Sequence, residues 1–253
     1  MIDSHCHLEE IENLGSAIEK AKSVGVIAIM AVGSDYESNN RTLEIAEKYS
    51  GFVYPALGLH PGRLEVSQVE QNLKFIEEHL TEVRGIGEIG LDYDKRIVKI
   101  APKELQKSVL KEVLIIAKKY QKPVIIHSRY AWRDSLALVE EAGIQKALFH
   151  WYTGPSGILK DIVRQGYFVS ATPAAEYHQE HRRAVKAAAL ENLLIETDSP
   201  VSYGTNIRWT AEPADVIRTL KAVAQVRGIN EEELSQITTN NAIKFFDLPL
   251  RLR

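Results

Sequence analysis

The chain has 253 residues, 45% of them hydrophobic and 26% charged, which is the composition of a folded protein and not of a disordered one. Its formal net charge of -3 provides no overall positive field for nucleic acid or an acidic membrane, so any polyanion must bind locally. Cys6 is the single cysteine, which excludes an intrachain disulfide and a cysteine cluster for zinc. Because no leader precedes the first motif and no apolar run could span a bilayer, we expect a cytoplasmic protein without membrane contact.

Short runs rich in Val, Ile and Leu alternate along the chain with longer segments of helical periodicity. The expected strands are the start of the chain, 24–32, 52–59, 85–90, 123–126, 147–149, 167–170 and 193–196. The expected helices cover 38–49, 67–80, 102–120, 131–142, 157–165, 211–226 and 231–246. Glu212-Pro213 introduces the first of the last two helices, and Asn230 before three glutamates caps the second.

This alternation predicts a parallel sheet, because parallel neighbours require crossover connections that cover both faces. A (β/α)8 TIM barrel, with residues 1–253 as a single domain, fits best. An open doubly wound sheet is the competitor, but it favours a glycine-rich phosphate loop, and no G-x-G-x-x-G or P-loop pattern occurs.

Metal-binding residue types recur where the expected strands end, which is where a barrel builds its active site. They are His5, His7, His60, Glu88, His127, His150 and Asp198. Each alone could cap a helix or face water, but together they form a ligand set for a divalent metal. The glycines around Glu88 are consistent with tight packing near a crowded site, or with ordinary strand and bulge roles; they are Gly85, Gly87 and Gly90. The remaining histidines are expected to be solvated; they are His79, His178 and His181.

Six motifs occur in order along the chain. They are S-H-C-H-L at 4–8, G-L-H-P at 58–61, G-E-I-G-L-D at 87–92, I-H-S-R at 126–129, F-H-W-Y-T-G at 149–154 and E-T-D-S-P at 196–200. In this combination the chain resembles the TatD family of metal-dependent deoxyribonucleases. The resemblance implies an amidohydrolase-like barrel, in agreement with the strand count.

The resemblance also implies how the ligands are shared. His5, His7 and Asp198 would hold one metal, His127 and His150 would hold a second, and Glu88 would bridge the two. Such a pair of ions can acidify a water and stabilise charge on the oxygens of a phosphodiester. Asp198 would be the general base and Glu88 the second catalytic residue. Asp3 is expected to support the site without binding metal.

Substrate contacts are less sharply indicated. His60 and Arg129 could each bind a substrate phosphate, or instead a loop amide and a surface carboxylate. Lys95 and Arg96 could attract a polyanion, although a solvated charged loop explains them better. Trp151 and Tyr152 could stack on unpaired bases, although aromatic residues beside a strand end more often pack.

Two segments depart from the family pattern. Trp151-Tyr152-Thr153 stands where Cys-Phe-Ser is common, and the late Arg-Asn-Glu-Pro segment appears only as Ala211-Glu212-Pro213 preceded by Trp209-Thr210. Neither departure removes an expected ligand, but both alter the mouth of the barrel.

We therefore expect a hydrolase with one or two divalent ions (Zn, Mn or Mg) that cleaves DNA by a metal-activated water, as a 3'-5' exonuclease on single-stranded ends. No obligate protein partner is expected. One alternative is a hydrolase of a small amide, lactone or phosphoester. Another is a binding module without catalysis, in which the metal only stabilises the barrel.

Overall fold

The computed structural model describes residues 1–250, which form an α/β barrel of parallel strands paired in chain order from β1 to β8. The strands are β1 (Ile2–Cys6), β2 (Ala28–Val32), β3 (Val53–Leu59), β4 (Gly85–Asp92), β5 (Val124–Arg129), β6 (Ala147–Phe149), β7 (Phe168–Ala171) and β8 (Leu193–Ile195). A parallel bridge between Cys6 and Ser199 joins the first strand to the segment after the last. The predicted TIM barrel is confirmed as a single-domain fold.

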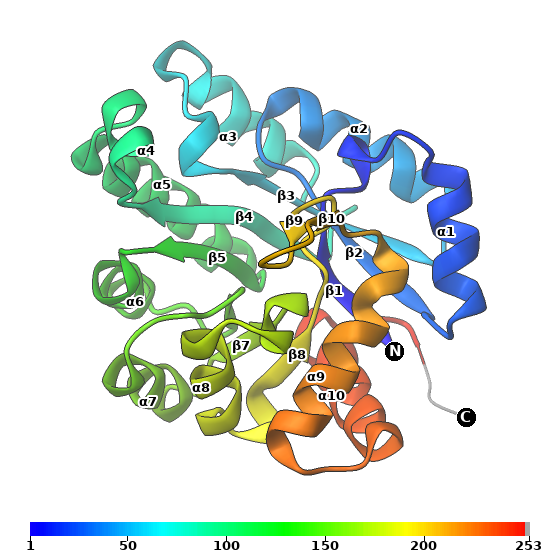
Figure 1. Cartoon of the computed structure of the whole chain (residues 1–253). Helices are drawn as coiled ribbons and strands as arrows, with labels where there is room; N and C mark the ends of the chain where they lie inside the picture. The colour runs from blue at the N-terminus through cyan, green and yellow to red at the C-terminus, as the bar shows by residue number, and fades with distance from the viewer. Residues whose placement is uncertain (251–253) are drawn as a thin grey trace.

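Helices surround the strands as an outer ring, seen along the barrel in Figure 1. They are α1 (Leu14–Ser23), α2 (Tyr36–Lys48), α3 (Val69–Glu78), α4 (Lys95–Ile100), α5 (Lys103–Tyr120), α6 (Trp132–Glu141), α7 (Ser156–Arg164), α8 (Gln179–Ala187), α9 (Val216–Arg227) and α10 (Glu231–Phe246). The sequence prediction omitted three of them (α1, α4 and α8), and it also omitted the hairpin of β9 (Ser202–Tyr203) and β10 (Trp209–Thr210). Within the described residues, no helix is long and apolar enough to cross a membrane.

Alternation along β2 shows how the barrel is filled. Ala28, Met30 and Val32 belong to the cluster inside the barrel, whereas Ile29 and Ala31 pack outward among the helices. Alternate side chains of β2 thus pack into the barrel interior and into the layer between the strands and the helices, which explains why this strand is apolar at every position.

One end of the barrel is closed by α10. Phe245 and Phe246 are buried in the interior cluster, and Arg84, just before β4, donates to the carbonyl of Asp247 at 3.2 Å. The predicted cap of this helix is confirmed, because Asn230 Oδ1 accepts from the backbone of Glu232 at 2.8 Å. With this end filled, the opposite end, where the strands finish, is left to form a site.

Candidate metal centre

The seam that closes the barrel brings the two ends of the motif series together. The backbone N–H of Asp198 donates to the carbonyl of His5 at 3.0 Å, and His7 N–H donates to the carbonyl of Ser199 at 2.8 Å. These bonds join residues more than 190 positions apart, so the fold itself sets the spacing of the three side chains.

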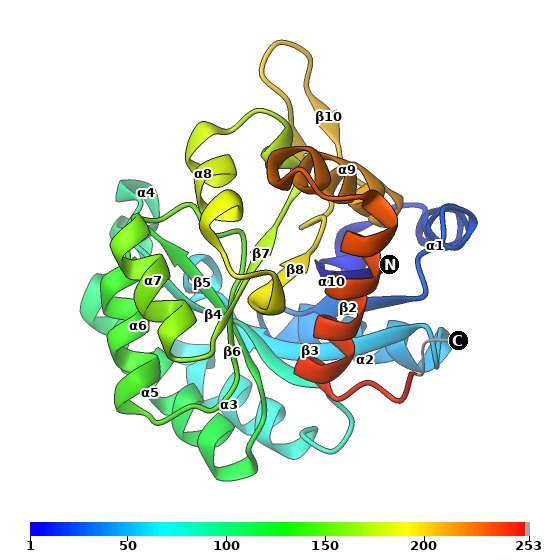
Figure 2. The ribbon, with the colours of Figure 1, turned by 90° about the horizontal axis from the view of Figure 1, so that it is seen from below.

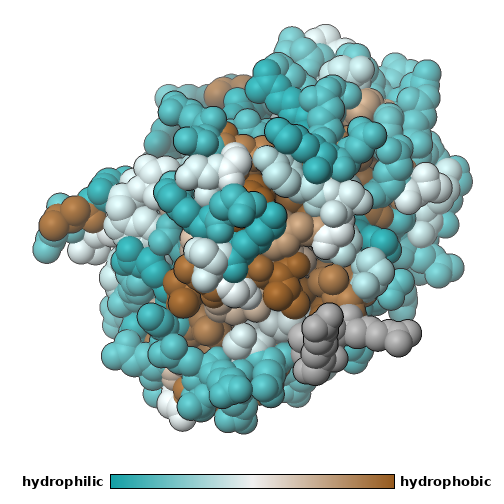
Figure 3. All heavy atoms as spheres, turned by 90° about the vertical axis from the view of Figure 1, so that its right-hand side faces the viewer, coloured by the Kyte–Doolittle hydropathy of each residue, from teal (hydrophilic) through white to brown (hydrophobic). Residues whose placement is uncertain are grey.

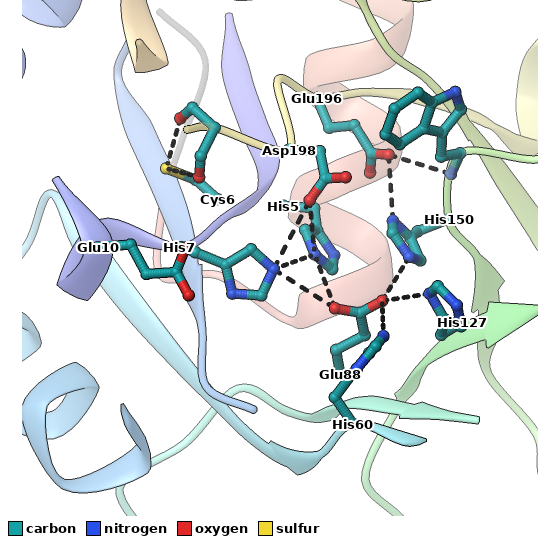
Figure 4. A network of polar contacts seen from close by, with 12 residues as sticks. His5, Cys6, His7, Glu10, His60, Glu88, His127, His150, Glu196 and Asp198 are labelled. Carbon is teal, nitrogen blue, oxygen red and sulfur yellow. Dashed lines mark hydrogen bonds and ion pairs between the residues drawn. The ribbon is translucent and has the colours of Figure 1, made fainter. Parts of the chain in front are cut away.

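Three atoms at this seam and one from Glu88 of β4 face a common point, as Figure 4 shows. His5 Nε2 lies 3.2 Å from His7 Nε2 and 3.4 Å from Asp198 Oδ1. Glu88 Oε2 lies 3.6 Å from His5 Nε2 and 3.4 Å from His7 Nε2. A tetrahedral ion with bonds of about 2.1 Å separates its ligand atoms by about 3.4 Å. The spacing of these four donors therefore fits one divalent metal.

The other oxygen of Glu88 faces a second group of nitrogens. Glu88 Oε1 lies 2.7 Å from His127 Nδ1, 2.7 Å from His150 Nε2 and 3.7 Å from His60 Nε2. One carboxylate thus presents one oxygen to each half of the cluster, which is the arrangement that a bridging ligand requires. The ligand atoms of His60, Glu88 and His127 lie close enough together to share one ion, whereas those of His150 lie close to His5 and Asp198.

His60 differs from the other rings of this cluster. The backbone N–H of Gly62 donates to its Nδ1 at 3.0 Å, so a neutral ring carries its proton on Nε2. Burial lowers the pKa of His60 to about 3, which keeps the ring neutral. An Nε2–H group that points into the site donates a hydrogen bond and offers no lone pair to a metal. This geometry supports the predicted contact with an anionic substrate oxygen.

The carboxylates of the metal centre favour positive charge on the groups that face them. Burial disfavours charge on His7 and His150, but the carboxylates around them, Glu88 with Glu9 and Asp198 for His7 and Glu88 with Glu196 for His150, together outweigh burial and raise the pKa of each ring well above its usual value. The pKa of Glu88 is in turn held well below its usual range, because neighbouring imidazoles outweigh its burial. Among the described residues, every ion pair of Glu88 and Asp198 is with a histidine. Protonated His7 and His150 balance the negative charge of the carboxylates in this structure, and a bound divalent ion would balance it in their place.

Carboxylates behind the rings complete the centre. His7 Nδ1 lies 3.6 Å from Glu9, His127 Nε2 lies 3.2 Å from Asp92, and His150 Nδ1 lies 3.4 Å from Glu196. The His127–Asp92 contact is a hydrogen bond, and a hydrogen bond of this kind fixes the orientation of a metal-binding imidazole and raises its basicity. Sequence reasoning missed the roles of these three carboxylates. Two of them were within reach, because Asp92 ends β4 and Glu196 lies two positions before Asp198.

Asp3 has the supporting role that was expected. It is fully buried, and it accepts from the backbone N–H of Thr197 at 2.9 Å and from the Thr197 hydroxyl at 2.6 Å. The carboxylate therefore ties the first strand to the segment that carries Asp198.

A cavity of about 740 Å³ opens over the metal centre. Its cationic lining includes Arg63, Arg129 and Arg208, and its aromatic lining includes Tyr130, Trp132 and Trp151. Arg63 pairs with Glu10 at 3.2 Å, and Arg129 pairs with Asp94 at 3.1 Å. Arg129 thus borders the cavity and also forms the salt bridge that was its structural alternative.

The other residues considered as substrate contacts differ in whether they border the cavity. Trp151 borders the cavity, whereas Tyr152 is buried and donates to the carbonyl of Pro155, so Tyr152 packs and offers no stacking surface. Arg96 pairs with Asp94 at 3.0 Å, which agrees with a solvated charged segment. Lys95 beside it is exposed at the start of α4.

Of the three histidines that were expected to be solvated, one is fully buried. His178 is exposed, and its ring caps α8 by accepting from the backbone of His181. His79 is half-buried against Phe75. The prediction is wrong for His181, which is fully buried; the polar residues around it concealed that α8 turns this position toward the barrel.

Comparison with known proteins decides the family. The family model described as TatD related DNase matches residues 2–247. The chain belongs to this family. Human deoxyribonuclease TATDN3 is 33% identical over 259 residues, which cover 97% of this chain and 94% of the relative. YabD of Bacillus subtilis, described as an uncharacterized metal-dependent hydrolase, is 31% identical over 97% of this chain and 98% of its own length.

Solved structures of the TatD family agree with the fold. The crystal structure of YJJV, a TatD homolog from Escherichia coli, superposes with a TM-score of 0.88 at 28% identity, covering 98% of each chain. The protein is therefore a metal-dependent hydrolase of the TatD family, with a buried cluster of histidine, glutamate and aspartate.

Proposed function

We propose that the protein hydrolyses phosphodiester bonds of DNA, as a 3'-5' exonuclease on single-stranded ends, with residues 1–253 acting as one hydrolase barrel. The observation that carries this proposal is the Glu88 carboxylate, whose two oxygens face two groups of metal-binding side chains beneath an open cavity. Relatives named as deoxyribonucleases in human and fission yeast support DNA as the substrate.

Cavity size favours strand ends. A volume of about 740 Å³ lies within the usual range for pockets that hold one small ligand. Such a cavity accommodates a terminal nucleotide with its diester more readily than the body of a duplex. Bases beyond it would have to leave the stack, which costs least at a single-stranded end.

The residues divide the work as follows. His5, His7 and Asp198 would hold one divalent ion, His127 and His150 would hold the other, and Glu88 would bridge them. When bound, these ions supply Lewis acidity and activate water for attack on phosphorus.

Asp198 accepts the proton of the attacking water. His60 donates from Nε2 to a nonbridging phosphate oxygen, and Arg129 contacts the phosphate from the rim. Water adds to phosphorus and the bond from phosphorus to the 3' oxygen of the remaining strand breaks. The proton taken up by Asp198 is returned to that oxygen, so the terminal nucleotide leaves as a 5'-phosphate monoester and the strand keeps a 3'-hydroxyl group.

A product ladder tests the proposal. Purified protein is stripped of metal, Zn, Mn or Mg is restored in turn, and single strands labelled at the 5' end or at the 3' end are digested. We expect successive shortening of 5'-labelled strands from the unlabelled end, and early release of label from 3'-labelled strands. Hydrolysis of small esters, lactones or amides with intact DNA would overturn the assignment in favour of the alternative substrates.

Asp198→Asn separates catalysis from a purely structural metal. The variant should keep the circular dichroism and the metal content of the wild type and lose most of its turnover, because the amide oxygen can still face the metal but the amide cannot accept the proton. Equal turnover by variant and wild type, with equal metal content by elemental analysis, would contradict the role of Asp198.

A further inference from the structure

A short hairpin leaves the barrel four residues after Asp198 and has no role in the chemistry described above. It consists of residues 202–210, with β9 and β10 paired antiparallel through Tyr203 and Trp209. Figure 2 shows this segment projecting beyond the ring of helices, and Figure 3 shows a projection with a hydrophobic tip at the left edge of a mainly hydrophilic face. Because it starts beside a metal-binding residue, whatever it holds lies close to the cavity.

The base of the hairpin is firmly attached. The hydroxyl of buried Tyr203 donates to the carbonyl of Thr197 at 2.8 Å. The Trp209 ring packs on Tyr203 at 5.5 Å between centroids, and the Arg218 guanidinium lies 3.9 Å from the Trp209 ring. Glu176 holds Arg218 through two hydrogen bonds of 2.8 and 2.7 Å. A clamped base allows the tip to keep its position over the barrel.

The turn also has a fixed shape. Gly204 has a φ of +101°, and a Cβ at this position would lie 2.1 Å from the carbonyl oxygen of Ile207. Only glycine therefore allows the two sides of the loop to approach so closely. Two adjacent residues of this loop, Ile207 and Arg208, are exposed, and Arg208 borders the cavity.

Arg208 differs from the other arginines that line the cavity because it has no carboxylate partner among residues 1–250. Arg63 and Arg129 each have a carboxylate partner, whereas Arg208 forms no ion pair with any residue in 1–250. An exposed guanidinium without a partner, at the edge of a site for phosphodiesters, is suited to bind an anionic oxygen.

Ile207 is exposed to an unusual degree for its type. It is 82% accessible, more than any other exposed large hydrophobic residue in the described part of the chain. An apolar side chain next to an unpaired arginine matches a single strand of nucleic acid, whose bases offer apolar faces beside charged phosphates.

We propose that hairpin 202–210 is an arm that holds the DNA strand outside the cavity, with Arg208 binding a backbone phosphate and Ile207 contacting a base. This inference rests on the proposed function and extends it to the nucleotides that flank the scissile bond. It makes the hairpin a determinant of substrate length and leaves the hydrolytic step to the metal centre.

Arg208→Ala tests the phosphate contact. Its KM for a 12-nucleotide single strand should rise about tenfold, as expected for loss of a charge-assisted hydrogen bond. Turnover of bis(p-nitrophenyl) phosphate, which has no flanking phosphate, should be unchanged. The slope of log KM against log salt concentration should fall by about 0.7, the amount for one phosphate contact on a single strand. Arg208→Lys should retain most of that slope.

Ile207→Ala tests the base contact, with an expected rise of about fivefold in KM for the same strand. Ile115→Ala and Arg164→Ala are matched controls, because both residues are exposed on outer helices, α5 and α7, and neither borders the cavity. The controls should behave as the wild type.

The outcomes distinguish two failures. A wild type that hydrolyses bis(p-nitrophenyl) phosphate and leaves DNA intact would overturn the proposed function. A wild type that digests DNA, with KM and salt slope unchanged in Arg208→Ala, would overturn the arm alone. Equal losses on both substrates would also overturn it, since they would place the effect at the metal centre.

Discussion

A buried histidine outside the metal centre provides a quantitative test of the structure. His181 lies on α8 with no accessible surface, and its Nε2 accepts from the backbone N–H of Thr172 at 3.0 Å. Its Nδ1 donates to the carbonyl of Tyr152 at 2.9 Å. Both ring nitrogens are satisfied only in the neutral form, because a proton on Nε2 would face the donor of Thr172.

The magnitude follows from linkage. Burial lowers the pKa of His181 from 6.5 to about 4 in the folded protein. As the pH falls below about 6.5, the unfolded chain binds a proton that the folded protein refuses, so the free energy of unfolding decreases. The loss between pH 7 and pH 5 is about 2 kcal/mol, and it reaches about 3 kcal/mol below pH 4.

Urea unfolding of the wild type and of His181→Gln at pH 7 and pH 5 measures this effect. The glutamine amide donates and accepts but does not titrate, and metal-free samples of both proteins keep the titration of the metal centre common to the two. The wild type should lose about 2 kcal/mol more than the variant over this interval. Equal losses in the two proteins would refute a neutral, buried His181, whatever the stability of the variant at pH 7.

Three further changes test the metal centre and its supports. Glu88→Gln should reduce the bound metal by at least one equivalent in elemental analysis; unchanged content would argue against a bridging carboxylate. Glu196→Gln weakens the support of His150 Nδ1, and metal affinity measured by competition with a chelator should fall by about tenfold to a hundredfold, against no change if Glu196 only packs. Gly90→Ala should lower the free energy of unfolding by about 3 kcal/mol in urea, because its Cβ would lie 2.0 Å from the carbonyl oxygen of His127; a stable variant would show that β4 can move away from β5.

The strands of the barrel could be predicted because their signal is local. Each is a short apolar run between helical segments, and all eight expected strands appear in the paired order of the barrel. The omitted elements lack such a signal. Helix α4 has only six residues, and α8 is rich in charged and polar residues, so its burial depends on the face that the fold turns inward. The two-residue strands of the hairpin are likewise too short to show an alternation.

The residues of the metal centre also divide into those that the sequence predicts and those that it does not. Side chains at strand ends could be expected to meet, because the geometry of a barrel gathers those ends at one rim. The carboxylates behind the histidines could not be assigned in the same way. Glu9 reaches His7 from the turn after β1, and the contact depends on the path of that turn, which no periodicity in the sequence specifies.

The two departures from the family pattern, far apart in the sequence, meet in space. Trp151 replaces the first residue of one pattern and Trp209 directly precedes the other, and their rings lie 5.3 and 5.5 Å from the ring of Tyr203. Tyr203 in turn is bonded to Thr197, next to Asp198. Trp151 borders the cavity, and Tyr203 and Trp209 form the base of the proposed arm. The three rings therefore make one aromatic cluster that connects the loop after β6 to the base of the arm, so a change in the volume of one ring would disturb the packing of the others.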